Sequence, residues 1–401
     1  MTPLLLSHFT ATSCLGHGLT ATFEALAAAR GGLAPCRFES VVLDTYIGEV
    51  AGVDAVRLPS ELQTYNCRNN RLAQLGLEQD GFIGAVHASA ARWGRRRLGV
   101  FLGTSTSGML ETELAYRMRT PPDGALPEQF EYPHQHNSFS VSDYVRRVLE
   151  IEGPAATLCT ACSSSAKAFA VAQRMIGAGL IDAAVVGGVD SLCLTTLYGF
   201  HSLQLSARTP CRPFDIARDG LSIGEAAAFA LLERAPTAPD ERDVILLASG
   251  ESSDAYHMSN PHPEGAGARM AMRGALEAAG VAASQIDYIN LHGTGTPNND
   301  NAESRAVTAL FGIETPCSST KGATGHTLGA SGALEAVICA LALRHDLLPG
   351  GLNVTQRDPR LELNYLTENR HTRVRRVLSN SFGFGGANCA LLFGRALEER
   401  D

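Results

Sequence analysis

The 401-residue sequence lacks the features of a membrane or exported protein. No run of about 18 apolar residues occurs, so we expect no membrane span. The first residues, MTPLLLSHFTATSCLGHG, contain no basic stretch, and the apolar run from Leu4 to Leu6 is too short for a signal peptide. Ten cysteines are scattered along the chain, and without an export signal they indicate reduced thiols. We therefore expect a cytoplasmic protein.

The sequence also lacks an excess of positive charge and a phosphate-binding motif. Its 33 Lys and Arg residues face 41 Asp and Glu residues, and the net charge of −8 argues against nucleic acid or an acidic membrane surface as a partner. No GxxxxGK[ST] motif is present. What is present is 45% hydrophobic residues and 40 glycines, a composition typical of a large globular enzyme with many tight turns.

Short apolar runs alternate with helical patterns from end to end, which predicts an α/β protein. The predicted strands cover 98–104, 183–189, 244–250 and 288–294, and the predicted helices include 164–180 and 267–280. The stretch ERAPTAPDERD (233–243) is charged and Pro-containing, so we expect it to separate two parts, 1–237 and 238–401. The Pro-rich stretch 119–137 is expected to be a surface loop.

Cys162 lies where an apolar segment turns into a long helix, in TLCTACSSSAKAFAVAQRM (157–175). A thiol at a helix start faces unpaired backbone N–H groups and the positive end of the helix dipole, which stabilise a thiolate. Those N–H groups can also hold an oxyanion. Two alternatives are a small core cysteine and a redox or zinc CxxC formed with Cys159. Zinc needs about four ligands, and no second CxxC or HxxxH follows.

Two histidines lie in Gly-rich loops of the second part. His292 follows an apolar run in NLHGTGTPNNDNAES (290–304), a place typical of active sites in α/β proteins, although a capping histidine would fit the same pattern. His326 lies in SSTKGATGHTLGASGALEA, between Lys321 and Glu335. A further Gly-rich turn, NSFGFGGANCALLF (380–393), could complete an anion site. One Cys and two His in such loops form a coherent set for acyl transfer.

At this point the motifs resemble one family, the elongating β-ketoacyl-acyl-carrier-protein synthases of the thiolase superfamily. The matching blocks occur in the family's order and span nearly the whole chain: TACSSSA, CRPFDIARDGLSIGEAAAFALLE, SSDAYHMSNPHPEG, HGTGTPNNDNAES, STKGATGHTLGASGALEA and SNSFGFGGAN. The resemblance implies a thiolase-like fold of two similar βαβαβαββ halves stacked in α-β-α-β-α layers. It also implies decarboxylative Claisen condensation of malonyl-carrier protein with an enzyme-bound acyl group.

The resemblance also suggests which residues carry the reaction. Cys162 resembles the nucleophile that takes the acyl group from acyl-carrier protein. His292 and His326 resemble the pair that supports malonyl decarboxylation and stabilises the enolate. Lys321 and Glu335 resemble the network that orients His326. The resemblance implies no metal ion and no organic cofactor, because phosphopantetheine arrives on the carrier-protein substrate.

Other motif positions imply substrate contacts. The N–H groups of Cys162 and Phe384 would form the oxyanion hole, and Phe384 with Phe382 would gate acyl access. Thr294 and Thr296 match positions that hydrogen-bond the pantetheine arm.

Two departures bear on the substrate. The nucleophile block reads CSSS, which resembles polyketide-type ketosynthases more than many fatty-acid enzymes. Thr106, in GTSTSGML (103–110), places a polar side chain near a position that often carries an apolar residue lining the acyl pocket. Both features favour a specialised polyene or polyketide pathway over housekeeping fatty-acid synthesis.

The expected partners are acyl-carrier protein and a second subunit, in a homodimer or in a heterodimer with a ketosynthase-like subunit. A carrier protein is acidic, so a local basic patch is required on this acidic enzyme. Arg68 and Arg71, spaced i and i+3 on a predicted helix, are candidates for that docking surface, together with Arg208.

Three alternatives to a condensing enzyme remain. A degradative or biosynthetic thiolase would need a second active-site cysteine, and Cys389 lies in an apolar run that we interpret as strand core. A non-catalytic partner subunit would lack Cys162. A redox protein would depend on Cys159 as well as Cys162.

Overall fold

Each half of the chain builds its own set of strands, and the two sets have the same order and directions. The structure, a computed structural model, describes residues 2–121, 124–235 and 240–396. In the first half the order is β1-β9-β7-β5-β6, with β9 antiparallel to β1 and β7, and with β5 parallel to β7 and β6. In the second half the order is β10-β17-β16-β11-β12, with the same directions at each corresponding pair. This duplication confirms the thiolase-like α/β fold that the resemblance implied.

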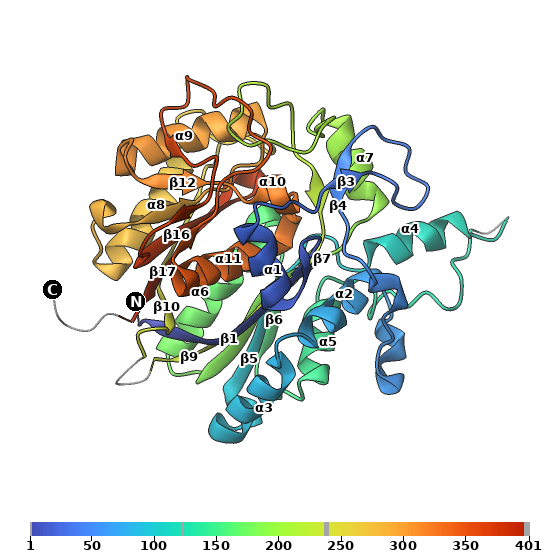
Figure 1. Ribbon diagram of the computed structural model, residues 1–401. Helices are drawn as coiled ribbons and strands as arrows, with labels where there is room; N and C mark the ends of the chain where they lie inside the picture. The colour runs from blue at the N-terminus through green and yellow to red at the C-terminus, as the bar shows by residue number, and fades with distance from the viewer. Residues whose placement is uncertain (1, 122–123, 236–239, 397–401) are drawn as a thin grey trace.

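The strands of the two halves join where β1 pairs antiparallel with β10 (Figure 1). The bounds in the first half are β1 Leu4–Ser13, β2 Gly16–His17, β5 Leu98–Gly103, β6 Ala155–Leu158, β7 Ala183–Asp190 and β9 Ala226–Arg234. In the second half they are β10 Val244–Ser253, β11 Tyr288–Asn290, β12 Pro316–Ser318, β14 Asn364–Tyr365, β16 Arg376–Phe382 and β17 Ala387–Arg395. Smaller sheets contain β3 Ala34–Pro35, β4 Tyr46–Gly48 and β8 Ile223–Gly224, and β13 Leu347–Leu348 with β15 Arg370–His371.

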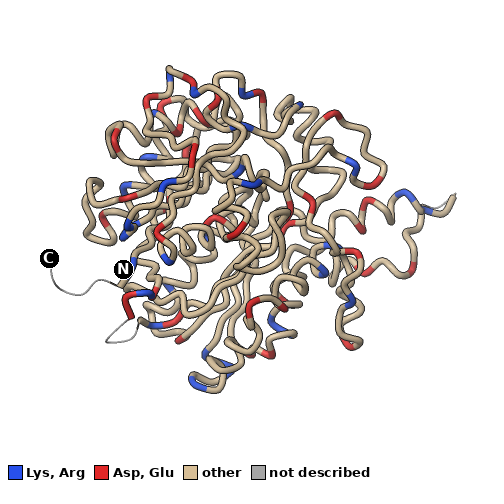
Figure 2. The backbone as a smooth tube through the Cα atoms, in the orientation of Figure 1, with Lys and Arg blue, Asp and Glu red and all other residues tan. Residues whose placement is uncertain are grey.

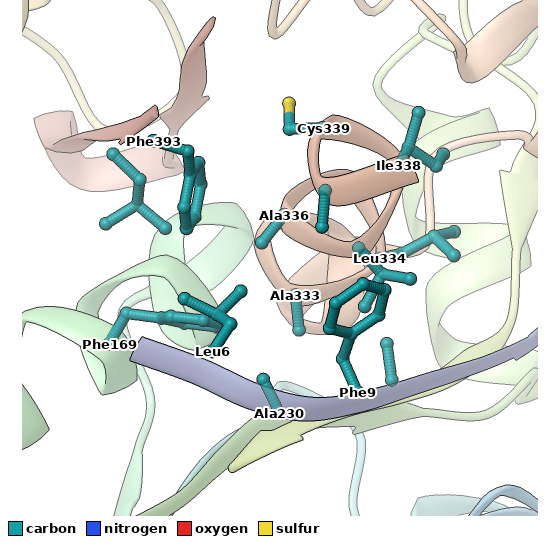
Figure 3. Close-up of a cluster of buried hydrophobic side chains, with 14 of the residues drawn as sticks. Leu6, Phe9, Phe169, Ala230, Ala333, Leu334, Ala336, Ile338, Cys339 and Phe393 are labelled. Carbon is teal, nitrogen blue, oxygen red and sulfur yellow. The ribbon is translucent and has the colours of Figure 1, made fainter. Parts of the chain in front are cut away.

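Two central helices lie between the strands of the two halves. α6 (Ser164–Gly177) contacts β5 and β7 of the first half and β10 and β17 of the second, and α11 (Ser331–His345) contacts β7, β9, β16 and β17. Figure 3 shows α11 packed between Phe9 on β1 and Phe393 on β17. Phe393 meets Phe169 of α6 edge to face, with ring centroids 6.2 Å apart.

α11 is buried from Ser331 to Leu343, and apart from Ser331 and Glu335 this stretch is apolar on every face. Among the described residues, one helical stretch, Leu328–His345, is long and apolar enough by composition to cross a membrane. This stretch consists of α11 and the three residues before it and is 89% buried inside the protein, as core helices of globular proteins are, so it does not alter the expectation of no membrane span.

Outer helices cover the remaining face of each half. α2, α3 and α5 pack on the first-half strands, and α8 and α9 pack over the second half, giving the α-β-α-β-α layering seen in Figure 1. The helix bounds are α1 Gly18–Ala27, α2 Arg68–Leu77, α3 Phe82–Trp93, α4 Met109–Arg117, α5 Ser140–Val148, α7 Leu194–Ser202, α8 Ala266–Ala279, α9 Pro297–Phe311 and α10 Lys321–Thr324.

The predicted elements agree with the observed ones. The four predicted strands correspond to β5, β7, β10 and β11, and the two predicted helices correspond to α6 and α8. β11 ends earlier than predicted, at Asn290, because the chain leaves the sheet to form the His292 loop. The boundary between 1–237 and 238–401 lies outside the described residues, between the end of β9 and the start of β10.

Candidate active site

Cys162 lies at a tight turn between β6 and α6. It belongs to a short 3-10 turn, η4 (Ala161–Ser163), that ends where α6 begins. Ala161 has φ +51°, a left-handed conformation that a non-glycine residue adopts at some cost. The hydroxyl of Ser164 holds the turn by accepting the N–H of Thr160 at 2.9 Å. Cys162 itself is only 5% exposed.

The structure brings Cys162, His292 and His326 together from three separate loops. His326 Nε2 lies 3.0 Å from Cys162 Sγ. The two imidazole rings meet edge to face, with centroids 5.3 Å apart. The Sγ atom and one nitrogen of each ring all lie within 4.8 Å of one another. One reacting group could therefore contact all three side chains.

Burial dominates the protonation of these groups. It raises the pKa of the Cys162 thiol to about 12, against the opposing effects of Lys321 and of the N–H groups of Phe384 and Cys162. Burial therefore opposes the thiolate that the N–H groups at the helix start favour. Burial and the Lys321 charge hold the pKa of both histidines well below the usual value, so both rings are neutral near pH 7.

Lys321 and Glu335 form a buried ion pair with each other. Burial raises the pKa of Glu335 to about 7, against the lowering effect of Lys321. The direct partner of His326 Nδ1 is instead the hydroxyl of Ser331, at 2.9 Å. Lys321 thus acts on the site through its charge, and the side chain that orients the ring is one that the sequence interpretation did not include.

The loop that carries His292 is held by Glu303, to which the sequence interpretation gave no role. Its carboxylate accepts the backbone N–H of His292 at 2.8 Å and that of Gly293 at 2.7 Å. Gly293 has no room for a side chain, because a Cβ there would lie 2.5 Å from Ser319. Asn380 donates to the same carboxylate at 3.1 Å. Glu303 lies on α9, and its spacing of 11 residues from His292 is the only trace of this contact in the sequence.

A cavity of about 200 Å³ leads to the three side chains. Thr294 and Thr296 line it, and their hydroxyls form a hydrogen bond with each other at 2.8 Å, which leaves one hydroxyl proton for a polar chain that enters. Phe384 and Phe200 also line it, with ring centroids 5.7 Å apart. The lining of this cavity is mostly apolar, and Cys162, His292 and His326 are part of it.

The turn between β16 and β17 brings the backbone of Phe384 to the sulfur. Its N–H lowers the pKa of Cys162, as does the N–H of Cys162 itself, so both donors favour negative charge at this position. Gly385 and Gly386, at φ +79° and +82°, permit the turn. Phe382 is buried beside His292, with ring centroids 5.8 Å apart, so it supports the histidine as well as lining the cavity.

Thr106 does not line this cavity, and its place near the acyl pocket stays a prediction. Its hydroxyl donates to Asp190 at 2.7 Å, and Asp190 also accepts the N–H of Ser105. Thr106 borders a separate hollow of about 300 Å³, which Cys159 and Tyr132 also line. The polar side chain is therefore explained by a buried carboxylate.

The prediction that Arg68 forms part of the carrier-protein docking surface is wrong. Its side chain is 1% exposed and donates to Glu225 at 2.6 and 3.0 Å and to Asp54 at 3.0 Å. Arg71 is 16% exposed and lies 3.5 Å from Asp54 and 3.6 Å from Glu111. Both arginines form ion pairs within the protein. Arg208 is exposed, in a chain whose basic and acidic residues are interspersed (Figure 2).

All ten cysteines lie in the described part of the chain and are free thiols. Cys389 is buried within β17, which confirms that it is strand core. Cys159 is exposed and lies in the separate hollow rather than in the cavity of Cys162.

Comparisons with known proteins identify the class. The sequence model of the β-ketoacyl synthase N-terminal domain matches residues 77–238, and that of the C-terminal domain matches residues 244–355. The chain therefore belongs to the β-ketoacyl synthase family. With this family, this fold and this site, it is a β-ketoacyl-acyl-carrier-protein synthase, a condensing acyltransferase.

Three of the matches show the likeness. The 3-oxoacyl-[acyl-carrier-protein] synthase 2 of Coxiella burnetii is 32% identical over 96% of this chain and 97% of its own length. A chain of the solved complex of the ketosynthase ApeO with its chain length factor ApeC, from Xenorhabdus doucetiae, is 40% identical, with 98% of both chains covered and a TM-score of 0.89. A structure described as the ishigamide ketosynthase/chain length factor is 26% identical, also with a TM-score of 0.89, over 99% of this chain and 100% of its own.

Proposed function

We propose that the enzyme forms its product by a two-step reaction on Cys162, in which acyl transfer comes first. The sulfur attacks the thioester carbonyl of an acyl-carrier protein, and His326 Nε2, at 3.0 Å, takes the thiol proton. The N–H groups of Cys162 and Phe384 hold the oxyanion. The carrier thiolate then leaves and takes the proton back from His326. The short His326–Cys162 contact is the observation that carries this step.

In the second step the pantetheine arm of a malonyl-carrier protein enters the same cavity, where Thr294 and Thr296 hydrogen-bond it. The bond to the carboxylate breaks, CO2 leaves, and the electron pair becomes an enolate whose oxygen accepts hydrogen bonds from His292 and His326. Neutral imidazoles suit this role, because a ring N–H donates without giving up its proton. The enolate carbon attacks the acyl group, and Cys162 leaves as thiolate. Phosphopantetheine arrives with the substrate, so we propose that no metal or organic cofactor takes part.

The histidine roles can be tested by measuring CO2 release from malonyl-carrier protein. His292→Ala and His326→Ala should each reduce it by at least ~10²-fold, the scale for losing a positioned acid–base group. His345→Ala is a matched control, because His345 stacks on Phe23 at the far end of α11. Wild-type decarboxylation in either active-site variant would refute the assigned roles.

We further propose that the enzyme serves a specialised polyene or polyketide pathway and pairs with a second ketosynthase-like subunit. The CSSS nucleophile block supports the pathway, and the ketosynthases ApeO and that of ishigamide are each solved with a chain length factor. Ten free cysteines are compatible with the cytoplasm as its compartment.

One surface of the chain suits a second subunit. β6 lies at the edge of the sheet, and an unpaired edge strand is a template for another chain. The hollow next to it is lined by Tyr132 and Cys159, and Cys159 follows β6 directly. Tyr132 and Phe139 lie between α4 and α5, and both are exposed. Exposed aromatic side chains beside an open edge are typical of an interface.

Native mass spectrometry can test this surface. Replacing Tyr132 and Phe139 together with Asp should convert dimers of the protein, alone or with a ketosynthase-like subunit, to monomers. Ile313→Asp is the matched control, since Ile313 is 51% exposed on the second half. If the double variant assembled as fully as the control, the proposed interface would be wrong.

A further inference from the structure

The imidazole of His326 has a partner on each nitrogen, and the partner on the side away from Cys162 is a hydroxyl. Ser331 Oγ lies 2.9 Å from Nδ1, and Cys162 Sγ lies 3.0 Å from Nε2. Ser331 is the first residue of α11 and is 1% exposed. The intervening 3-10 turn, η6 (Leu328–Ala330), includes Leu328 at φ +52° and returns the chain to the ring.

A hydroxyl differs from other common partners of imidazole because it can both donate and accept. A carboxylate only accepts, and a backbone N–H only donates. When Ser331 donates to Nδ1, the ring carries its proton on Nε2. When Ser331 accepts from Nδ1–H, Nε2 presents its lone pair to the thiol.

Thr327 allows the Ser331 hydroxyl to switch between donating to the ring and accepting from it. Its Oγ1 lies 3.2 Å from Ser331 Oγ and is buried with it. The Thr327 hydroxyl can donate to Ser331 while Ser331 donates to the ring, and can accept from Ser331 while Ser331 accepts from the ring. Both directions therefore keep the Ser331 hydroxyl satisfied, which a buried polar group requires.

The two steps of the reaction need the hydrogen bond between Ser331 and His326 in opposite directions. In acyl transfer, Nε2 takes the Cys162 proton, and the resulting imidazolium lies buried near the Lys321 charge. An acceptor on Nδ1–H then stabilises it. In decarboxylation, Nε2–H donates to the enolate oxygen, and Nδ1 needs a donor.

We propose that Ser331 is a positioning residue that, together with Thr327, lets His326 serve both steps by reversing one hydrogen bond. This role rests on the two-step reaction assigned above and extends it to a side chain that does not touch substrate.

The test separates the two steps in Ser331→Ala. Acylation is measured by rapid quench with a small acyl-pantetheine thioester, and decarboxylation by CO2 release from malonyl-carrier protein. Each rate constant should fall about tenfold, the rate equivalent of one hydrogen bond, with little change in KM. Ser331→Thr keeps the hydroxyl and should restore most of both rates.

The matched control is Ser165→Ala. Ser165 is fully buried, and its hydroxyl accepts the N–H of Ala333, two residues beyond Ser331 on α11. This variant removes a comparable hydroxyl and should lose stability while keeping both rates.

Two results would overturn the proposal. One is a Ser331→Ala enzyme whose two rates fall no further than those of Ser165→Ala, which would make the hydroxyl structural. The other is a loss in one step only, which would mean that Ser331 works in a single direction. The ¹⁵N shifts of His326 provide a readout without turnover, since they should move toward one tautomer in Ser331→Ala and stay unchanged in Ser165→Ala.

Discussion

Replacing Arg68 with Ala should destabilise the fold and leave carrier-protein recognition intact. Arg68 gives two hydrogen bonds to Glu225, which is fully buried, so the change leaves a carboxylate without its counter-ion. Removing one partner of a buried pair typically costs about 3 to 5 kcal/mol.

The structure favours the lower end of that range. Glu225 keeps the backbone N–H groups of Val50 and Leu192, each at 2.9 Å, and the exposed Asp54 can return to water. We therefore expect a loss of about 3 kcal/mol. For a chain of this size that is a fall in Tm of about 6 °C, at about 2 °C per kcal/mol.

The assay combines thermal unfolding with kinetics on two substrates. For Arg68→Ala, the KM for acyl-carrier protein relative to that for a small pantetheine thioester should equal the wild-type ratio. Arg208→Glu is the contrasting variant, because Arg208 is exposed: it should keep its Tm and raise only the KM for the carrier. An Arg68→Ala enzyme with a wild-type Tm and a raised carrier KM would refute this reasoning.

Three further predictions concern the site. Glu303→Gln places an amide NH2 opposite two backbone donors. We therefore expect a loss of about 1 to 3 kcal/mol in unfolding free energy, together with slower decarboxylation. Unchanged values in both measurements would contradict the role of Glu303. Zn²⁺ should inhibit the condensation, because one sulfur and two imidazole nitrogens lie within 4.8 Å of one another. A chelator should restore activity. Insensitivity to Zn²⁺ would mean that the three atoms do not converge in solution. Burial raises the pKa of Cys162 to about 12, so we expect a protonated thiol at neutral pH. The rate of its alkylation by iodoacetamide should then rise about tenfold per pH unit from pH 7 to 9. A rate that is already constant at pH 7 would indicate a thiolate.

Local patterns predicted the parts of this protein that depend on neighbours in the chain. The apolar segment, the cysteine and the serines of 157–175 specify a strand, a turn and a helix, and the structure has β6, η4 and α6 there. The alternation of strands and helices likewise indicated an α/β fold.

The errors came from contacts between distant parts of the chain. The i and i+3 spacing placed Arg68 and Arg71 on one helix face but did not reveal that this face points inward, to a glutamate 157 residues away. The hydrogen bond between Thr106 and Asp190, which the sequence did not predict either, spans 84 residues. Ser331 and Glu303 lie within the quoted motifs, but no local rule distinguishes them from neighbouring polar residues until the loops are folded together.

The central claim is that Cys162 carries the acyl group, and intact-protein mass spectrometry followed by peptide mapping tests it most directly. Incubation with a panel of acyl-carrier proteins should add one acyl group to the wild-type chain, on the peptide that contains Cys162. Cys159→Ala should acquire the same mass, and Cys162→Ala should acquire none. Acyl groups on Cys162→Ala, or their absence from Cys159→Ala, would contradict the account.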